Sequence, residues 1–129
     1  RLSVVGCAVL VVAAGCSSIF EPDRRAVILP ITKVEAPAAA APGTSFSVTF
    51  TASMFNGCIK FERFESTKTD RSLTVTAHGS VPTRNDMMCT QDVRTKTFAE
   101  VVTPPATDPF SIIATQPNGT ATTVQVRIQ

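Results

Sequence analysis

The 129-residue chain contains neither tryptophan nor tyrosine, and its only histidine is His78. Tryptophan and tyrosine are the side chains that most often anchor protein interfaces and stack on sugars, so their absence argues against a carbohydrate-binding site. A single histidine also restricts acid–base chemistry, because any Ser-His-Asp arrangement would have to use His78. The sequence contains no nucleophile-elbow, calcium-loop, phosphate-loop or HExxH motif.

Blocks of like charge are absent as well. Twelve basic and ten acidic residues are interspersed along the chain and give a formal net charge of +2. Phosphate backbones are bound by clustered basic faces, so this dispersed, near-neutral charge argues against nucleic acid as a partner. What remains is a chain rich in Thr, Ser, Val and Phe, which is a composition typical of β-structure.

One apolar run stands out, at the N-terminal end of the sequence. Residues 2–15 contain no charged residue and follow Arg1. At 14 residues, the run is shorter than the roughly 20 that a helix needs to cross a bilayer. A short apolar segment behind a basic residue is typical of a secretory signal peptide. The run ends in the sequence Ala13-Ala14-Gly15-Cys16.

This sequence resembles the lipobox of bacterial lipoproteins, in which small residues precede a cysteine that is acylated before the signal peptide is cleaved. The resemblance implies that residues 1–15 are a lipoprotein signal peptide. It also implies that Cys16 becomes the lipidated N-terminus, with acyl chains such as palmitate holding it to the membrane. Ala13 departs from the family pattern, which usually has leucine there. A similar sequence ends at Cys7, but processing there would leave residues 8–15 as an exposed apolar tail.

The residue after Cys16 predicts the compartment. Lipoprotein sorting commonly reads an aspartate at that position as a retention signal, and this chain has Ser17. By the same resemblance, the protein is expected at the bacterial cell envelope. It would lie on the outer membrane, facing the periplasm, if the host has two membranes.

Two further cysteines, Cys58 and Cys89, remain in the chain after residue 16. Two thiols in an oxidising compartment most simply pair, and here they would close a loop of about 30 residues. A redox-active pair or a metal site is the alternative. The two cysteines lack CxxC spacing, and no second pair of ligands accompanies them. We therefore predict a structural disulfide.

The chain after residue 15 divides into a tether and one domain. Residues 16–25 are polar, with a proline and opposing charges, as expected of a short linker. Residues 26–129 have the size of a single domain. Residues 44–52 alternate apolar and hydroxyl side chains, which is the pattern of a half-buried strand. Asn118-Gly119, between two strand-like segments, predicts a β-hairpin.

About seven strands and no helix are expected in the domain, which predicts an all-β, antiparallel β-sandwich. The arrangement resembles the immunoglobulin-like and fibronectin-type modules of bacterial surface proteins. A small β-barrel with a similar number of strands is the alternative fold.

Three segments carry irregularities. Pro30 interrupts residues 26–34, so that segment is expected to be an edge strand or a kinked one. Residues 58–66 place Phe61 and Phe64 on opposite faces of a regular strand, so either a β-bulge lies near Glu62-Arg63 or both faces are partly covered.

The third irregular segment is residues 93–103, a further predicted strand. Arg94, Lys96 and Glu100 mark an exposed side, and Phe98 falls on that same side, which a bulge or a contact patch would explain. Upstream of it, His78-Gly79 is expected to end a strand and to begin a long connection to Cys89.

Few residues suggest chemistry. His78, Met87, Met88 and Cys89 combine imidazole, thioether and thiol groups, which suit Cu(I). Adjacent methionines near a disulfide more commonly pack within a loop, so we predict no metal and no cofactor. Asp70 and several serines could accompany His78, but no activating context surrounds them, so we predict no catalytic residue.

The sequence therefore predicts a non-enzymatic binding or assembly module, bound to the membrane through Cys16 and contacting another envelope protein. Residues 83–92, residues 104–109 and the edge near Pro30 are the candidate contact regions. A protease inhibitor of the small β-sandwich kind is one alternative function. An envelope hydrolase, with His78 and an acidic residue in one pocket, is the other.

Overall fold

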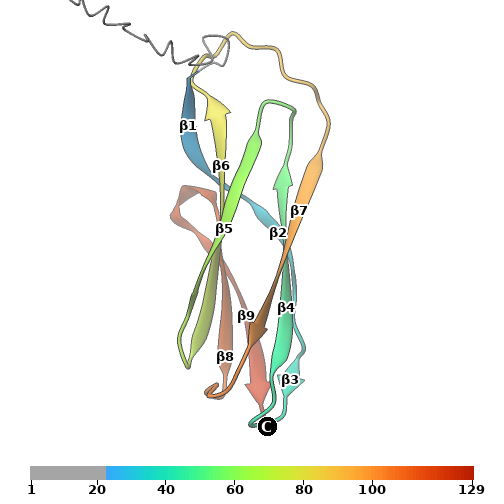
Figure 1. The fold of residues 1–129 in the computed structure, drawn as a ribbon, viewed down its shortest axis with the longest axis vertical. Coiled ribbons are helices and arrows are strands. Elements are labelled where there is room, and N and C mark those ends of the chain that lie inside the picture. The colour runs from blue at the N-terminus through green and yellow to red at the C-terminus, as the bar shows by residue number, and fades with distance from the viewer. Residues whose placement is uncertain (1–22) are drawn as a thin grey trace, which may run out of the picture.

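The computed structural model describes residues 23–129, which form two β-sheets packed face to face (Figure 1). The predicted all-β, immunoglobulin-like sandwich is confirmed. The described chain contains nine strands: β1 (Arg24–Leu29), β2 (Ile31–Glu35), β3 (Ala39–Ala40), β4 (Phe46–Met54), β5 (Lys60–Lys68), β6 (Ser72–Pro82), β7 (Arg94–Val102), β8 (Phe110–Thr115) and β9 (Ala121–Ile128). The count exceeds the expected seven because residues 26–34 supply two strands and β3 is a short addition.

The larger sheet is organised around β6. Its strand order is β1-β6-β8-β9-β3, and β5 pairs with the other edge of β6. β1 lies along residues 77–82 and β8 along residues 72–75, so two strands share one edge of β6. Most pairs are antiparallel, but β6 with β8 and β3 with β9 are parallel. The smaller sheet has the order β2-β4-β7 and is entirely antiparallel.

The chain crosses between the sheets at Pro30, where β1 of one sheet ends and β2 of the other begins. The predicted break at this proline is confirmed. Pro30 cannot donate a hydrogen bond, but its carbonyl accepts one from Ser53 N at 3.0 Å. Next to it, the side-chain amide of Gln116 bonds both backbone groups of Ile31. Ile31 N donates to Oε1 at 3.0 Å, and Nε2 donates to Ile31 O at 2.8 Å.

The core lies between the sheets and follows the predicted alternation. Val48 and Phe50 of β4 and Leu73 and Val75 of β6 are completely buried. The hydroxyl residues between them face outward, as in any strand that buries one face. The hairpin from β8 to β9 is also confirmed, and Asn118 adopts the left-handed conformation that its turn requires (φ 68°).

A β-bulge interrupts β5, which is one of the two arrangements that the sequence allowed. The pairing with β6 shifts between Phe61 and Arg63, so Glu62 is the extra residue. Because of this insertion, Phe61 and Phe64 both point inward, with ring centroids 4.9 Å apart. Without the bulge, a three-residue spacing would place these rings on opposite faces.

Strand β6 is longer than expected. The prediction that a connection begins at His78-Gly79 is wrong, since β6 continues to Pro82 and pairs there with β1 and β5. A glycine is needed at position 79, within the strand, because the backbone of β5 approaches it closely. A Cβ at this position would lie 2.6 Å from Lys60 O and 2.7 Å from Leu29 Cδ2. Glycine here reflects close packing, not a turn.

The expected orientation of β7 is also wrong. Phe98 pairs with Phe50 and faces the interior, and it stacks on Phe64 of β5 with centroids 5.0 Å apart. Arg94 and Lys96 therefore lie on the inward-facing side of β7 as well. They reach solvent because β5 and β7 are both edge strands, which leaves this side of the sandwich open.

The described domain begins slightly earlier than expected. β1 starts at Arg24, not at residue 26. Arg24 belongs to the fold because its guanidinium donates to Ser80 Oγ and Ser80 O, both at 2.8 Å. The proposed tether is correspondingly shorter. The predicted signal peptide (residues 1–15) and the lipidation site Cys16 lie outside the described residues.

Candidate functional site

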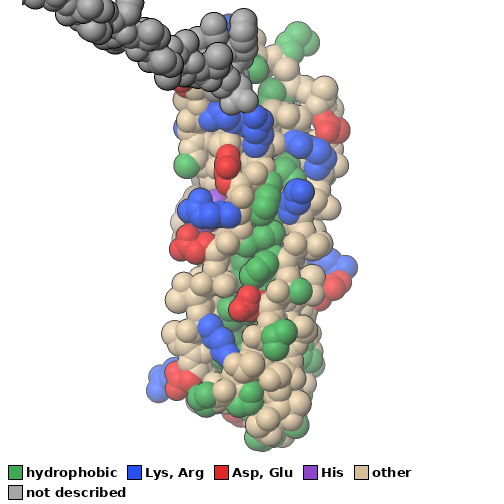
Figure 2. Space-filling model, viewed as in Figure 1, with side chains coloured by type: hydrophobic (Ala, Val, Ile, Leu, Met, Phe, Trp, Pro, Cys, Tyr) green, Lys and Arg blue, Asp and Glu red, His purple; other side chains and the backbone are tan. Residues whose placement is uncertain are grey.

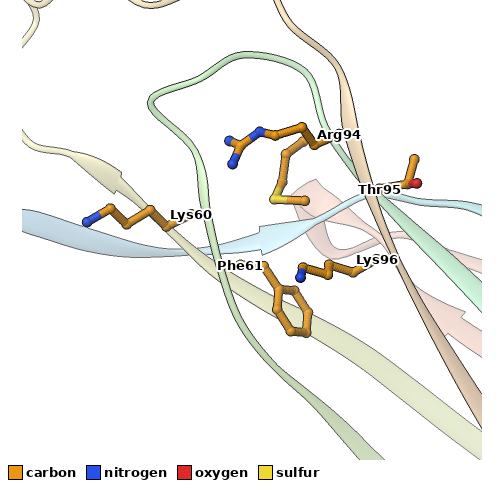
Figure 3. Close-up of a pocket in the computed structure, with 6 residues that line it drawn as sticks. Lys60, Phe61, Arg94, Thr95 and Lys96 are labelled. Carbon is orange, nitrogen blue, oxygen red and sulfur yellow. The ribbon is translucent and has the colours of Figure 1, made fainter.

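The open side of the sandwich contains a groove between the first residues of β5 and β7. It has a volume of about 470 Å³ and is lined by Met54, Lys60, Phe61, Arg94, Thr95 and Lys96 (Figure 3). We call it the β5/β7 groove. Figure 2 shows the same side of the molecule: apolar side chains follow its middle, and Lys and Arg side chains flank them in the upper half. The groove combines an apolar floor with cationic walls.

The cations of the groove differ in how they are held. Arg94 is fixed, because its Nη2 donates to Ile59 O at 2.6 Å and its Nε lies 3.4 Å from Asp92 Oδ2. Lys96 Nζ lies 6.0 Å from the centre of the Phe61 ring, at the outer limit of a cation–π contact. Among residues 23–129, no carboxylate lies within 4.0 Å of Lys60 or Lys96.

Asp92 belongs to the rim of the groove. Its pKa is lowered mainly by the hydrogen bond from Thr90 Oγ1, with a smaller contribution from the charge of Arg94. Asp92 is thus held in its charged form and neutralises Arg94 in part. The two lysines carry the uncompensated positive charge.

His78 lies on the outer face of β6 and forms part of a polar cluster. Its Nε2 is 3.1 Å from Glu65 Oε2, on the neighbouring strand. Its expected position at a strand end, facing solvent, is wrong: it lies within β6, and its side chain is mostly covered. A pairing with Asp70 is not formed. Asp70 lies in the turn between β5 and β6, where its carbonyl accepts a bond from Thr107 N.

Ser80 is the serine nearest to His78 along the outer face, and its hydroxyl is already engaged. It donates to Glu62 Oε1 at 2.9 Å and accepts from Arg24 Nε at 2.8 Å. An oxygen that accepts a bond from a guanidinium is a poorer nucleophile, because its lone pair is stabilised. The cluster joins β1, β5 and β6 and accounts for how Ser80 can be buried.

The residues weighed as copper ligands lie in different places. His78 lines a depression on the outer face, beside Arg24 and Ser80. Met87 and Cys89 line another depression at the end of the sandwich, and Met88 projects into solvent. In residues 23–129, no three His, Cys, Asp or Glu side chains are grouped closely enough to hold a metal ion.

The predicted disulfide between Cys58 and Cys89 is confirmed, with Cα atoms 5.3 Å apart. It joins the turn between β4 and β5 to the loop between β6 and β7. Gly57 N donates to Thr90 O at 2.9 Å beside it, so the two segments are linked by backbone as well as by sulfur. This linkage brings Lys60 and Arg94 to the same end of the molecule.

Comparisons with known proteins identify no relative: no family model matches the chain, and no curated protein or solved structure matches it either. Within residues 23–129, no helix has the length and apolar character needed to cross a bilayer.

Proposed function

We propose that this protein is a lipid-anchored bacterial envelope protein that acts as a non-enzymatic binding module, and that the β5/β7 groove receives an anionic group of its partner. The observation that carries the proposal is the pair of lysines, Lys60 and Lys96, without carboxylate partners among the described residues. Lys96 Nζ lies 6.0 Å from the centre of the Phe61 ring, which with Met54 forms the apolar floor, and Lys60 extends outward from the rim of the groove (Figure 3). A carboxylate or phosphate that contacts Lys96 at this floor would lose part of its water and bind more strongly.

Arg94 prepares the groove for such a ligand. Its guanidinium is fixed by the carbonyls of Ile59 and Asn56, so it adds positive potential without having to be ordered on binding. Less conformational entropy is then lost when the ligand binds. The lysines supply the contacts that adjust to the shape of the ligand.

Strand addition, in which a partner's segment pairs with a free sheet edge, is disfavoured at several edges. The start of β2 is covered by the Gln116 amide, and the end of β9 is covered by β3. β5 has a bulge, and β7 carries inward-facing Arg94 and Lys96. Bulges and inward charges are the devices by which sheet edges avoid pairing with other chains. Recognition through side chains in the groove therefore fits the molecule better.

The anchor is tested by the mass of the protein purified from its native membrane. We expect the wild-type chain to begin at Cys16 and to carry the added mass of a diacylglyceryl group, because the thiol is the predicted acylation site. A Cys16→Ser variant should lack this mass. An unmodified Cys16 in membrane-derived protein would contradict the anchor.

The groove is tested by photo-crosslinking in intact cells from a photoreactive phenylalanine analogue placed at Phe61, whose ring lines the groove (Figure 3). The wild-type background should give a discrete crosslinked product. Lys60→Ala with Lys96→Ala should reduce it about tenfold, since two charged contacts are lost.

Lys33→Ala is the matched control, because Lys33 is exposed, lies on β2 and is paired with Glu35. Its product should equal that of the wild type. Equal yields from the double variant and the control would rule out the groove as the binding site.

A further inference from the structure

Exposed apolar side chains gather at one end of the sandwich. Of the large apolar residues that are exposed in the described chain, only Val101 lies elsewhere; the others are Phe55 (52% exposed), Met87 (39%), Met88 (98%) and Val93 (61%). They come from the turn between β4 and β5 and the loop between β6 and β7, which the Cys58–Cys89 disulfide joins. We call this end the disulfide tip. Figure 1 shows both segments at the same end of the ribbon.

Positive charge surrounds these side chains. The tip and the strand ends beside it carry four carboxylates, Asp23, Glu62, Asp86 and Asp92, and six cations, namely Arg24, Arg25, Lys60, Arg84, Arg94 and Lys96. Arg84 is paired with Asp86 at 2.9 Å, and this hydrogen bond lowers the pKa of Asp86. Even with such pairs, the tip has an excess of positive charge beside its apolar residues.

The chain also enters the domain at this end. Asp23 O accepts hydrogen bonds from Thr83 N at 2.9 Å and from Thr83 Oγ1 at 3.2 Å. This contact places the first described residue beside the loop that carries Met87 and Met88. Cys16 is seven residues upstream of Asp23, a span of about 25 Å at most when fully extended.

We infer that the disulfide tip lies in the interface of an anionic lipid bilayer. Phe55 and Met88 would enter the boundary between headgroups and acyl chains, while Arg25 and Arg84 would remain among the phosphates. Exposed apolar residues ringed by cations are the arrangement by which peripheral proteins bind such interfaces. The tip contributes a membrane contact separate from any lipid on Cys16.

A bilayer fits the tip better than a protein partner does. Met88 is 98% exposed and so has almost no packing neighbour, whereas the core of a protein interface is closely packed. A fluid lipid interface accepts separated side chains of this kind. The entry of the chain at the same end points to the same partner, because a lipid on Cys16 would hold the tip near the membrane.

The test uses the mature chain, residues 16–129, with Cys16→Ser to remove the lipid. The core is built from residues 29–126, so this chain keeps it. Flotation with vesicles of phosphatidylcholine, with or without phosphatidylglycerol, then measures binding by the tip alone. We expect binding to the anionic vesicles, loss of binding to the neutral ones, and weaker binding in high salt.

Phe55→Ser with Met88→Ser should weaken binding to the anionic vesicles about tenfold or more, because two inserted apolar groups are lost. Val101→Ser is the matched control: Val101 is 55% exposed but lies on β7 away from the tip, and its variant should bind like the parent. Failure of the parent to float, or equal binding by the tip and control variants, would overturn the inference. So would a tip-dependent dimer without vesicle binding, which would mean that a second copy covers the tip. Because the Cys16→Ser chain itself carries no lipid, these results are independent of the proposed anchor.

Discussion

Phe50→Ala is expected to lower the free energy of unfolding by about 3 to 5 kcal/mol, the usual cost of removing a buried aromatic ring. Phe50 is completely buried in β4, and Phe98 lies beside it with ring centroids 6.4 Å apart. Phe98 in turn stacks on Phe64, which packs on Phe61. These four rings form a row between the two sheets. The substitution would therefore leave a cavity at the buried end of this row.

Urea unfolding followed by far-ultraviolet circular dichroism measures this loss, and Phe55→Ala provides the control. Phe55 is largely exposed, so its variant should differ from the wild type by less than about 0.5 kcal/mol. A change of under about 1 kcal/mol for Phe50→Ala would contradict the packing described here. Small domains are stable by only about 5 to 15 kcal/mol, so the expected loss is a large part of the total.

Removal of the disulfide should have an effect of similar size. The bond closes a loop with a sequence separation of 31 residues. The chain-entropy model then gives a stabilisation of about 3 to 4 kcal/mol. Cys58→Ser with Cys89→Ser is expected to shift the urea midpoint accordingly, and adding a reductant to the wild type should reproduce the shift.

The serine variant and the reduced wild type act as controls for each other, because one changes the side chains and the other changes only the bond. Both should keep the β-sheet circular dichroism spectrum, since the core does not include the two cysteines. Stability unaffected by either treatment would mean that the two loops remain close to each other in the unfolded chain.

Local patterns predicted a large part of the fold. Alternation in residues 44–52 predicted the buried row of β4, and the spacing of Phe61 and Phe64 indicated a bulge as one of two possibilities. Asn118-Gly119 gave the last hairpin. These features depend on neighbouring residues alone, so the sequence contains what is needed to predict them.

The errors came from residues whose surroundings lie far away in the chain. Gly79 has the usual signature of a turn, but Lys60 O and Leu29 occupy the space that a side chain would need. Phe98 shares a face with Arg94 and Lys96, so the sequence predicted that this face of the strand is exposed to solvent. That face is inward, because β7 is an edge strand beside the open side of the sandwich. The alternation of apolar and polar residues along one strand does not reveal the order of the strands in a sheet.

The β5/β7 groove could not have been predicted in the same way. Lys60 and Lys96 are 36 residues apart, and each is unremarkable beside its sequence neighbours. The cysteine pairing was the one signal that related the two segments, since it joins the loops just before β5 and β7. Bringing Lys60 and Lys96 to one groove would have required the pairing of β4 with β7 and of β5 with β6.

The crossing at Pro30 has a mechanical consequence. For a domain held through Asp23, tension would act along β1, whose pairs with β6 run from Arg24 opposite Pro82 to Leu29 opposite Ala77. These pairs are loaded in shear and share the force, so they cannot be peeled away one by one. Since β1 continues directly into β2, the same pull reaches both layers of the sandwich at once. If the domain is held through Asp23, the held end would thus also be the end at which its two sheets resist separation together.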